Sequence, residues 1–219
     1  MATVMTPQLE KAFATLRQFA RKRSAAERCE MCALVLGPEH DHLVDPTNRK
    51  LICACNACAI LFEAQSGSKF KRVPRGVLYL QEFQLTDAQW DGLAIPIDMA
   101  FFFKSTPLAK VVALYPSPAG PMESLLPLDA WTEIVASNPI LSRMLPDVTA
   151  LLVNRIGHAR GVIPAEYYLV PIDDCYKLVG LIRMHWRGLS GGTEVWREIN
   201  SFFAALRARS GIGEGSRNA

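Results

Sequence analysis

Residues 29–62 read CEMCALVLGPEHDHLVDPTNRKLICACNACAILF, a stretch that contains two C-x-x-C pairs. The first pair is Cys29 and Cys32, the second is Cys55 and Cys58, and 22 residues separate the pairs. A C-x-x-C turn presents two sulfur atoms toward a common point, and two such turns supply the four thiolates of a tetrahedral metal site. We therefore predict that these four cysteines bind one metal ion.

The metal site defines a small zinc-ribbon-like module over residues 29–64 that is too short to fold without its metal ion. Three further residues in the module offer ligand atoms: Cys53, His40 and His42. Cys53 lies two residues before Cys55 and could replace it. Because four thiolates already satisfy zinc, we treat Cys53 and the two histidines as alternate ligands.

Zinc and iron both accept four thiolates, so a rubredoxin-like iron site is the main alternative. Rubredoxin cysteines usually have Pro and Gly as neighbours, whereas Glu30, Met31 and Ala57 occupy such positions here. This difference favours zinc. A closed four-thiolate shell leaves no open position for a substrate, so the predicted role of the metal is structural.

Composition sets the broad class of the protein. The chain has 219 residues, of which 50% are apolar and 21% charged, with a net charge of +3. These values predict a folded domain of ordinary size with a small appendage. The slight net charge differs from that of a dedicated nucleic-acid-binding protein. We find no signal peptide and no membrane span, and we expect a cytoplasmic protein, in which paired cysteines favour metal binding over disulfides.

Four segments are predicted along the chain. Residues 1–28 form a basic amphipathic helix that begins at Thr6 and Pro7. Residues 29–64 are the metal module, and a Gly/Ser linker follows at 65–69. Residues 70–210 form an α+β domain, and residues 211–219 form a flexible tail.

In the α+β domain, apolar runs predict a mostly antiparallel sheet with packed helices. The strand candidates are Val77–Phe83, Ile97–Phe103, Val111–Tyr115, Ala150–Ile156 and Tyr167–Val170. Thr86, Asp173 and Thr193 are predicted to cap the helices that follow them.

No arrangement of residues predicts a catalytic site, and the sequence favours a protein that is not an enzyme. Cys175 near a helix start could be an activated thiol, but it has no histidine nearby in the sequence, and Asp173 and Asp174 oppose a thiolate. Ser190-Gly191-Gly192 precedes the last helix and could bind an anion, but it fits a tight connection better.

The sequence resembles an uncharacterised bacterial family of unknown function whose genes lie near those of actinobacterial-type nickel–iron uptake hydrogenases. The likeness spans Cys29 to Arg209. The segments that carry it are GPEHDHLVDP (from Gly37), LICACNACAILF (from Leu51), IPIDMAFFFKS (from Ile95), ALYPSPAGPMESLLPLDAW (from Ala113), YYLVPIDDCYKLVGLIR (from Tyr167) and WRGLSGGTEVWREI (from Trp186). The resemblance implies an accessory or assembly role and supplies no catalytic residue.

Three functions are consistent with the sequence. The first is a non-catalytic zinc-binding accessory protein that binds proteins, with hydrogenase subunits or maturation factors as the partners that the resemblance implies. The second is a rubredoxin-like iron protein or a thiol redox protein. The third is a nucleic-acid-binding zinc-ribbon protein, which the few basic residues of the module disfavour.

Overall fold

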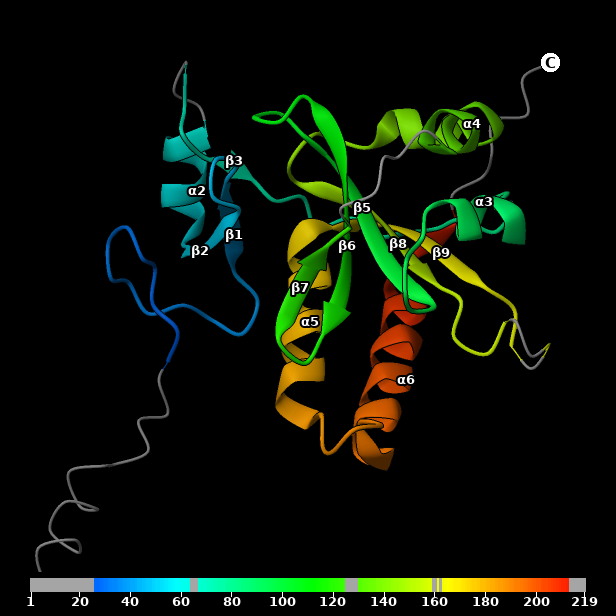
Figure 1. The fold of residues 1–219 in the computed structure, drawn as a ribbon. Helices are drawn as coiled ribbons and strands as arrows, with labels where there is room; N and C mark the ends of the chain where they lie inside the picture. The colour runs from blue at the N-terminus through cyan, green and yellow to red at the C-terminus, as the bar shows by residue number, and fades with distance from the viewer. Residues whose placement is uncertain (1–25, 64–66, 125–129, 159–160, 162, 213–219) are drawn as a thin grey trace, which may run out of the picture.

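The computed structural model describes residues 26–63, 67–124, 130–158, 161 and 163–212 (Figure 1). Residues 1–25 of the helix predicted over residues 1–28 lie outside the described part of the chain. The described residues form a seven-stranded sheet with helices on both faces, and a second, three-stranded sheet beside it (Figure 1).

The large sheet has the strand order β10-β4-β9-β8-β5-β6-β7. Its strands are β4 (Leu78–Tyr79), β5 (Met99–Ser105), β6 (Lys110–Ser117), β7 (Gly120–Glu123), β8 (Thr149–Asn154), β9 (Glu166–Pro171) and β10 (Gly211–Ile212). Every neighbouring pair is antiparallel except β10 with β4. The predicted α+β class with a mostly antiparallel sheet is therefore confirmed.

Helices cover the two faces of this sheet. Their bounds are α3 (Asp87–Gly92), α4 (Ala130–Ser137), the 3-10 helix η1 (Pro139–Arg143), α5 (Ile172–His185) and α6 (Gly192–Arg209). In β5, Phe101 and Phe103 lie in the core under α5 and α6, whereas Phe102 lies in the core with Trp90 of α3 and Trp131 of α4. This alternation follows from the two-residue period of a strand and explains why β5 is apolar throughout.

The three-stranded sheet carries the cysteine-rich stretch. It has the order β2-β1-β3 and consists of β1 (Asp41–Asp45), β2 (Lys50–Ala54) and β3 (Lys71–Arg72), and α2 (Asn56–Glu63) follows β2. β3 comes after the predicted linker at 65–69 and pairs with β1. The division of the chain at that linker remains a prediction. Below, "module" denotes residues 26–63 together with β3, and "body" denotes the part described from residue 74 onward.

The module packs directly on the body. Val44 of β1 belongs to the core formed by α5 and α6. Lys71 of β3 pairs with Asp147 of the body at 2.6 Å, and Arg49 pairs with Glu123 at 3.0 Å. The Arg49 guanidinium also lies over the Phe103 ring, 5.5 Å from its centroid. Apolar burial and charge pairing together therefore hold the module against the start of α5.

The predicted helix caps had different outcomes. Thr86 caps α3 as expected: its hydroxyl accepts a hydrogen bond from the Gln89 N–H, and the Gln89 side chain accepts one from the Thr86 N–H. The prediction for Asp173 was wrong because α5 already begins at Ile172, and the Asp173 carboxylate binds His42 instead. The prediction for Thr193 was also wrong: α6 already begins at Gly192, so Gly191 occupies the N-cap position and Thr193 lies inside the helix.

Gly191 makes the tight connection between α5 and α6 possible. Its φ is +86°, and a Cβ at this position would lie 2.8 Å from Cγ1 of Val195. Only glycine fits this combination without strain. The Ser190-Gly191-Gly192 stretch therefore forms a tight turn that connects α5 to α6.

Two strands also differ from their predicted bounds. The strand expected over Val77–Phe83 is confined to Leu78–Tyr79. Gly211–Ile212, expected in the tail, form β10 and pair with β4, while residues 213–219 lie outside the described part. Among the described helices, none has both the length and the apolar character needed to cross a membrane.

Candidate metal centre

The first cysteine pair lies on a tight turn at the start of the module. The Ala33 N–H donates to the Cys29 carbonyl at 2.8 Å, and the Cys29 N–H donates to the Leu34 carbonyl at 2.8 Å. Ala33 has a φ of +62°, which reverses the chain directly after Cys32. Cys29 is buried and Cys32 is exposed, so the pair lies at the edge of the module.

The second pair lies at the beginning of α2. Cys55 directly precedes this helix, and its carbonyl accepts a hydrogen bond from the Ala59 N–H at 2.9 Å. The Cys58 N–H points at Cys55 Sγ from 3.5 Å. A helix N-terminus favours negative charge, which metal-bound thiolates would carry. The second pair therefore belongs to a helix start, whereas a ribbon would place it in a turn between strands.

The four sulfur atoms converge. The Sγ atoms of Cys29, Cys32, Cys55 and Cys58 all lie within 4.8 Å of one another, and those of Cys32 and Cys55 are 3.7 Å apart. Sulfur atoms about 2.3 Å from a tetrahedral zinc ion are about 3.8 Å apart. The donor set and its spacing therefore fit a tetrahedral metal ion.

The thiols interact strongly with one another and with the backbone. Burial raises the pKa of Cys29, but hydrogen bonds from the backbone N–H groups of Cys55, Cys32 and Met31 outweigh it and lower the pKa to about 6. Hydrogen bonding to Cys55, together with burial, raises the pKa of Cys58 to about 12. One thiolate is thus favoured in the metal-free chain, and a metal ion would displace the remaining protons.

The core around the four cysteines is very small. Its fully buried members are Cys29, Leu43, Ile52, Ala54, Cys55 and Ala59. Two of these six residues are themselves candidate ligands, so little apolar surface remains to stabilise the fold around the cysteines. Metal binding at such a site would supply folding free energy directly.

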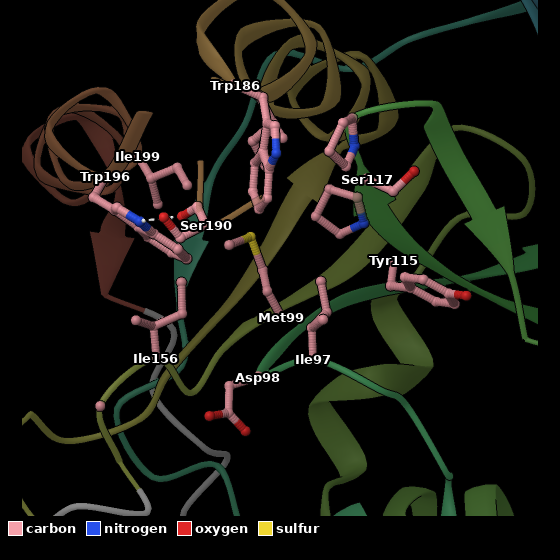
Figure 2. A pocket seen from close by; sticks show the side chains of 14 residues that line it. Ile97, Asp98, Met99, Tyr115, Ser117, Ile156, Trp186, Ser190, Trp196 and Ile199 are labelled. Atoms are coloured by element: carbon pink, nitrogen blue, oxygen red, sulfur yellow. Dashed lines mark hydrogen bonds between the residues drawn. The ribbon is translucent and has the colours of Figure 1, made fainter. Parts of the chain in front are cut away.

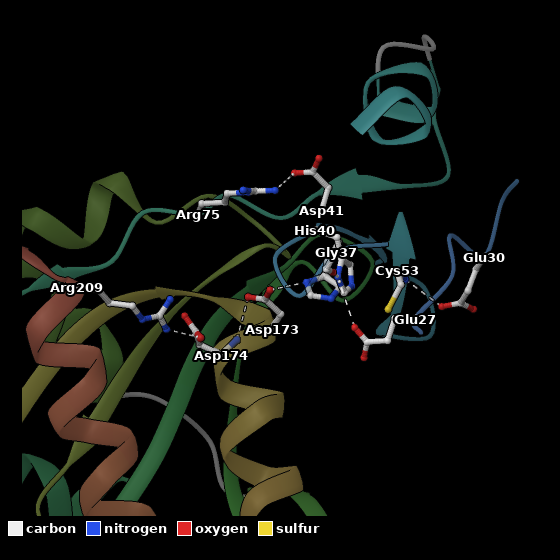
Figure 3. A network of polar contacts seen from close by, with 11 residues as sticks. Glu27, Glu30, Gly37, His40, Asp41, Cys53, Arg75, Asp173, Asp174 and Arg209 are labelled. Atoms are coloured by element: carbon white, nitrogen blue, oxygen red, sulfur yellow. Dashed lines mark hydrogen bonds and ion pairs between the residues drawn. The ribbon is translucent and has the colours of Figure 1, made fainter. Parts of the chain in front are cut away.

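The three alternate ligands form a separate group. Cys53 is absent from the set of sulfur atoms within 4.8 Å of one another and lies with His40 and His42 instead (Figure 3). Strand alternation explains this, because Ile52 and Ala54 face the cysteine core while Leu51 packs toward the body. Cys53 shares the face of Leu51. The alternating pattern of β2 was visible in the sequence and could have separated Cys53 from its neighbours.

Cys175 is an inert core residue. It is fully buried, and burial raises its pKa well above the ordinary thiol value. A buried protonated thiol is a poor nucleophile. The remaining histidines contact carboxylates: His185 Nδ1 lies 3.0 Å from Glu194, and His158 Nε2 lies 3.6 Å from Asp87.

An apolar pocket of about 640 Å³ (Figure 2) includes Ile182 and Trp186 at the C-terminal end of α5, whereas the module contacts Asp173 at the start of that helix. Trp186 after α5 and Trp196 of α6 line one side of it, and Ile97 and Met99 at the start of β5 line the other. The 14 residues of α5 rise 1.5 Å each, so the two ends of this helix are about 20 Å apart. Sequence reasoning missed this pocket because its residues come from distant segments.

Comparisons with other proteins leave the site itself unassigned. Neither the curated proteins nor the solved structures include a match to this chain. A family model matches residues 28–210, from the residue before the first cysteine to the end of α6. The chain therefore belongs to DUF5947, a family of unknown function.

Proposed function

We propose that the chain is a zinc-binding accessory protein that acts by binding other proteins, with nickel–iron hydrogenase subunits or maturation factors as its partners. The observation that carries the proposal is the convergence of four sulfur atoms within 4.8 Å. Four thiolates fill the coordination shell of zinc and leave no position for a substrate. The metal therefore shapes a surface, and the partner assignment follows from the sequence resemblance to a hydrogenase-linked family.

The apolar pocket supplies a second support for a binding role. Ile97, Leu189 and Trp196 are exposed apolar side chains in or beside it. Exposed apolar surface around a cavity is typical of protein interaction sites. We assign this pocket to apolar side chains of the partner protein.

A role in nucleic-acid binding fits the module less well. Most of its basic side chains, and those of the segment that follows it, are paired with carboxylates: Lys50 with Glu30, Lys69 with Asp45, and Arg72 and Arg75 with Asp41. Arg28 instead donates to the Ala33 carbonyl. Neutralised cations contribute little to phosphate binding. We expect no salt-sensitive shift of DNA or RNA in a gel-shift assay.

Metal analysis and an absorbance spectrum of the purified chain test the identity of the metal. Zinc in the four-cysteine site predicts a colourless protein with at least one zinc ion per chain. Visible thiolate-to-iron absorption with stoichiometric iron would replace the zinc assignment by the rubredoxin-like alternative.

Affinity purification of the tagged chain from a bacterium that produces a nickel–iron hydrogenase tests the partner. We expect recovery of a hydrogenase subunit or a maturation factor, and loss of that partner in the Ile97→Glu/Leu189→Glu variant. Leu145→Glu is the matched control, because Leu145 is exposed and apolar but lies outside the pocket lining. Recovery of metal-loaded chain without either class of partner, across several growth conditions, would overturn the partner assignment.

A further inference from the structure

Strand register brings two histidines and a cysteine to one face of the module sheet. His42 of β1 is the direct cross-strand partner of Cys53 in β2. His40 lies two residues before His42, so the period of an extended chain places it on the same side. Side chains of such cross-strand pairs lie about 5 Å apart at Cβ. One ring nitrogen of each histidine and Cys53 Sγ all lie within 4.8 Å of one another.

Hydrogen bonding leaves the same nitrogen of both histidines free. His40 Nδ1 lies 3.0 Å from the Gly37 carbonyl, and His42 Nδ1 lies 2.7 Å from Asp173 Oδ2. A carbonyl or carboxylate oxygen can only accept, so Nδ1 carries a proton in each ring, and in the neutral imidazole Nε2 offers the lone pair.

His40 Nε2 is a buried polar atom without a partner among the described residues. The His40 side chain is only 7% exposed, so solvent does not satisfy this atom. An unpaired buried acceptor costs free energy, because burial has removed its hydrogen bond to water. Such a group in a folded protein calls for a ligand, and its neighbours here are a second imidazole, with ring centroids 4.7 Å apart, and a thiol.

Asp173 connects this cluster to the body. It lies in the first turn of α5, and its carboxylate accepts from His42 across the boundary between the module and the body (Figure 3). Carboxylates that accept the second N–H of a histidine are a common feature of metal sites, where they fix the ring and increase its basicity. Glu27 Oε2, 3.5 Å from His40 Nδ1, adds a further negative charge.

We propose that His40, His42 and Cys53 bind a second metal ion, a late first-row divalent ion such as Zn²⁺, with one coordination position left open. Imidazole and thiolate donors select such ions over Mg²⁺ and Ca²⁺, which prefer oxygen. Three protein ligands with a fourth position for water or an exogenous group distinguish this site from the closed four-thiolate site. The two sites lie on opposite faces of the module sheet, so neither shares a ligand with the other.

A cysteine–histidine nucleophile is the competing interpretation of the same residues. Such a pair needs one imidazole as base. It would leave the second imidazole unexplained. The convergence of two imidazoles and one thiol is accounted for by a shared metal ion.

Titration of the metal-stripped full-length chain with Zn²⁺ alone, and separately with Co²⁺, tests the proposal. The wild type should bind two ions per chain, and His40→Ala/His42→Ala and Cys53→Ser should each bind one. Their remaining cobalt spectrum should be that of four thiolates. His185→Ala is the control, because His185 also contacts a carboxylate but lies outside the cluster, and it should bind two ions.

Two further variants separate ligand loss from misfolding. Asp173→Asn should weaken the second site about 10- to 100-fold, whereas Asp174→Asn, which changes the neighbouring residue that pairs with Arg209, should leave both sites unchanged. One ion per wild-type chain, with a four-thiolate cobalt spectrum, would overturn the second site and leave the four-cysteine site intact. A second ion that remains bound in all the cluster variants would overturn it as well.

Discussion

The body and the module achieve stability in different ways. The body buries two large apolar clusters, one on each face of its seven-stranded sheet. The module buries six residues at its cysteine site, two of them cysteines, and its Val44 packs into one of the clusters of the body. Burial of a large aliphatic or aromatic side chain contributes about 1.5–3 kcal/mol, so the body can fold on apolar burial alone. We therefore expect the module to need a metal ion in addition.

The largest expected effect comes from removing the first cysteine pair. Cys29→Ser/Cys32→Ser should abolish metal binding at the four-cysteine site and unfold the module, because structural zinc contributes about 10 kcal/mol or more to folding of such units. Hydrogen exchange should show β1 and β2 unprotected while β5 and β8 stay protected. Wild-type protection of β1 and β2 in this variant would contradict the claim that the module, unlike the body, depends on its metal ion.

A core substitution in the body should have the opposite pattern. Phe101→Ala removes a fully buried ring that packs between the sheet and α5 and should lower the free energy of unfolding by about 3–5 kcal/mol. Chemical denaturation measures this loss, and metal content per folded chain should not change. A parallel loss of metal would mean that the two regions fold as one unit.

The link between Lys71 and Asp147 should contribute less. Burial disfavours the Asp147 charge, but hydrogen bonds from Lys71 and from the side chain and backbone of Thr106 outweigh it and lower the pKa of Asp147. Asp147→Asn should cost about 1–2 kcal/mol, because Lys71 remains partly exposed.

The pH dependence of the same pair has a defined sign. A lowered carboxyl pKa stabilises the folded state above the ordinary value of about 3.9 and loses that contribution as pH falls through the lowered value. The stability of the wild type should therefore decline more steeply below pH about 4 than that of Asp147→Asn. Equal slopes in acid denaturation would argue against a stabilising Asp147 carboxylate.

The smallest effect is expected at Arg49. Its ion pair with Glu123 and its contact with the Phe103 ring are partly exposed, so Arg49→Met should cost about 0.5–1.5 kcal/mol. Arg197→Met, which breaks an exposed pair with Glu198, is the matched control and should have almost no effect. Thermal unfolding curves of the two variants can be compared directly; a cost at Arg197 equal to that at Arg49 would mean that Arg49 does not anchor the module.

The sequence predicted the features that depend on local chemistry. The spacing of Cys29, Cys32, Cys55 and Cys58 brought four sulfur atoms into one group, as expected. The Thr86 cap also depends on neighbouring residues and was predicted. The Asp173 prediction failed because of a distant partner: Asp173 satisfies the ordinary rule for a cap, but its carboxylate binds His42, 131 residues away.

The same distinction explains the missed histidine–cysteine cluster. His40, His42 and Cys53 were each visible in the sequence as alternate ligands. Their grouping depends on the register of β1 with β2 and on the burial that α5 provides. Neither can be read from residue spacing, because a register shift of one residue would turn Cys53 to the other face.

Hydrogen exchange of the wild-type chain before and after metal removal tests the central claim most directly. A thiol-competing chelator should strip the metal, expose β1 and β2 to exchange and leave β5 and β8 protected, and added Zn²⁺ should restore protection. Full protection of β1 and β2 in a chain shown by metal analysis to be metal-free would contradict the account, because the module would then fold without its metal ion.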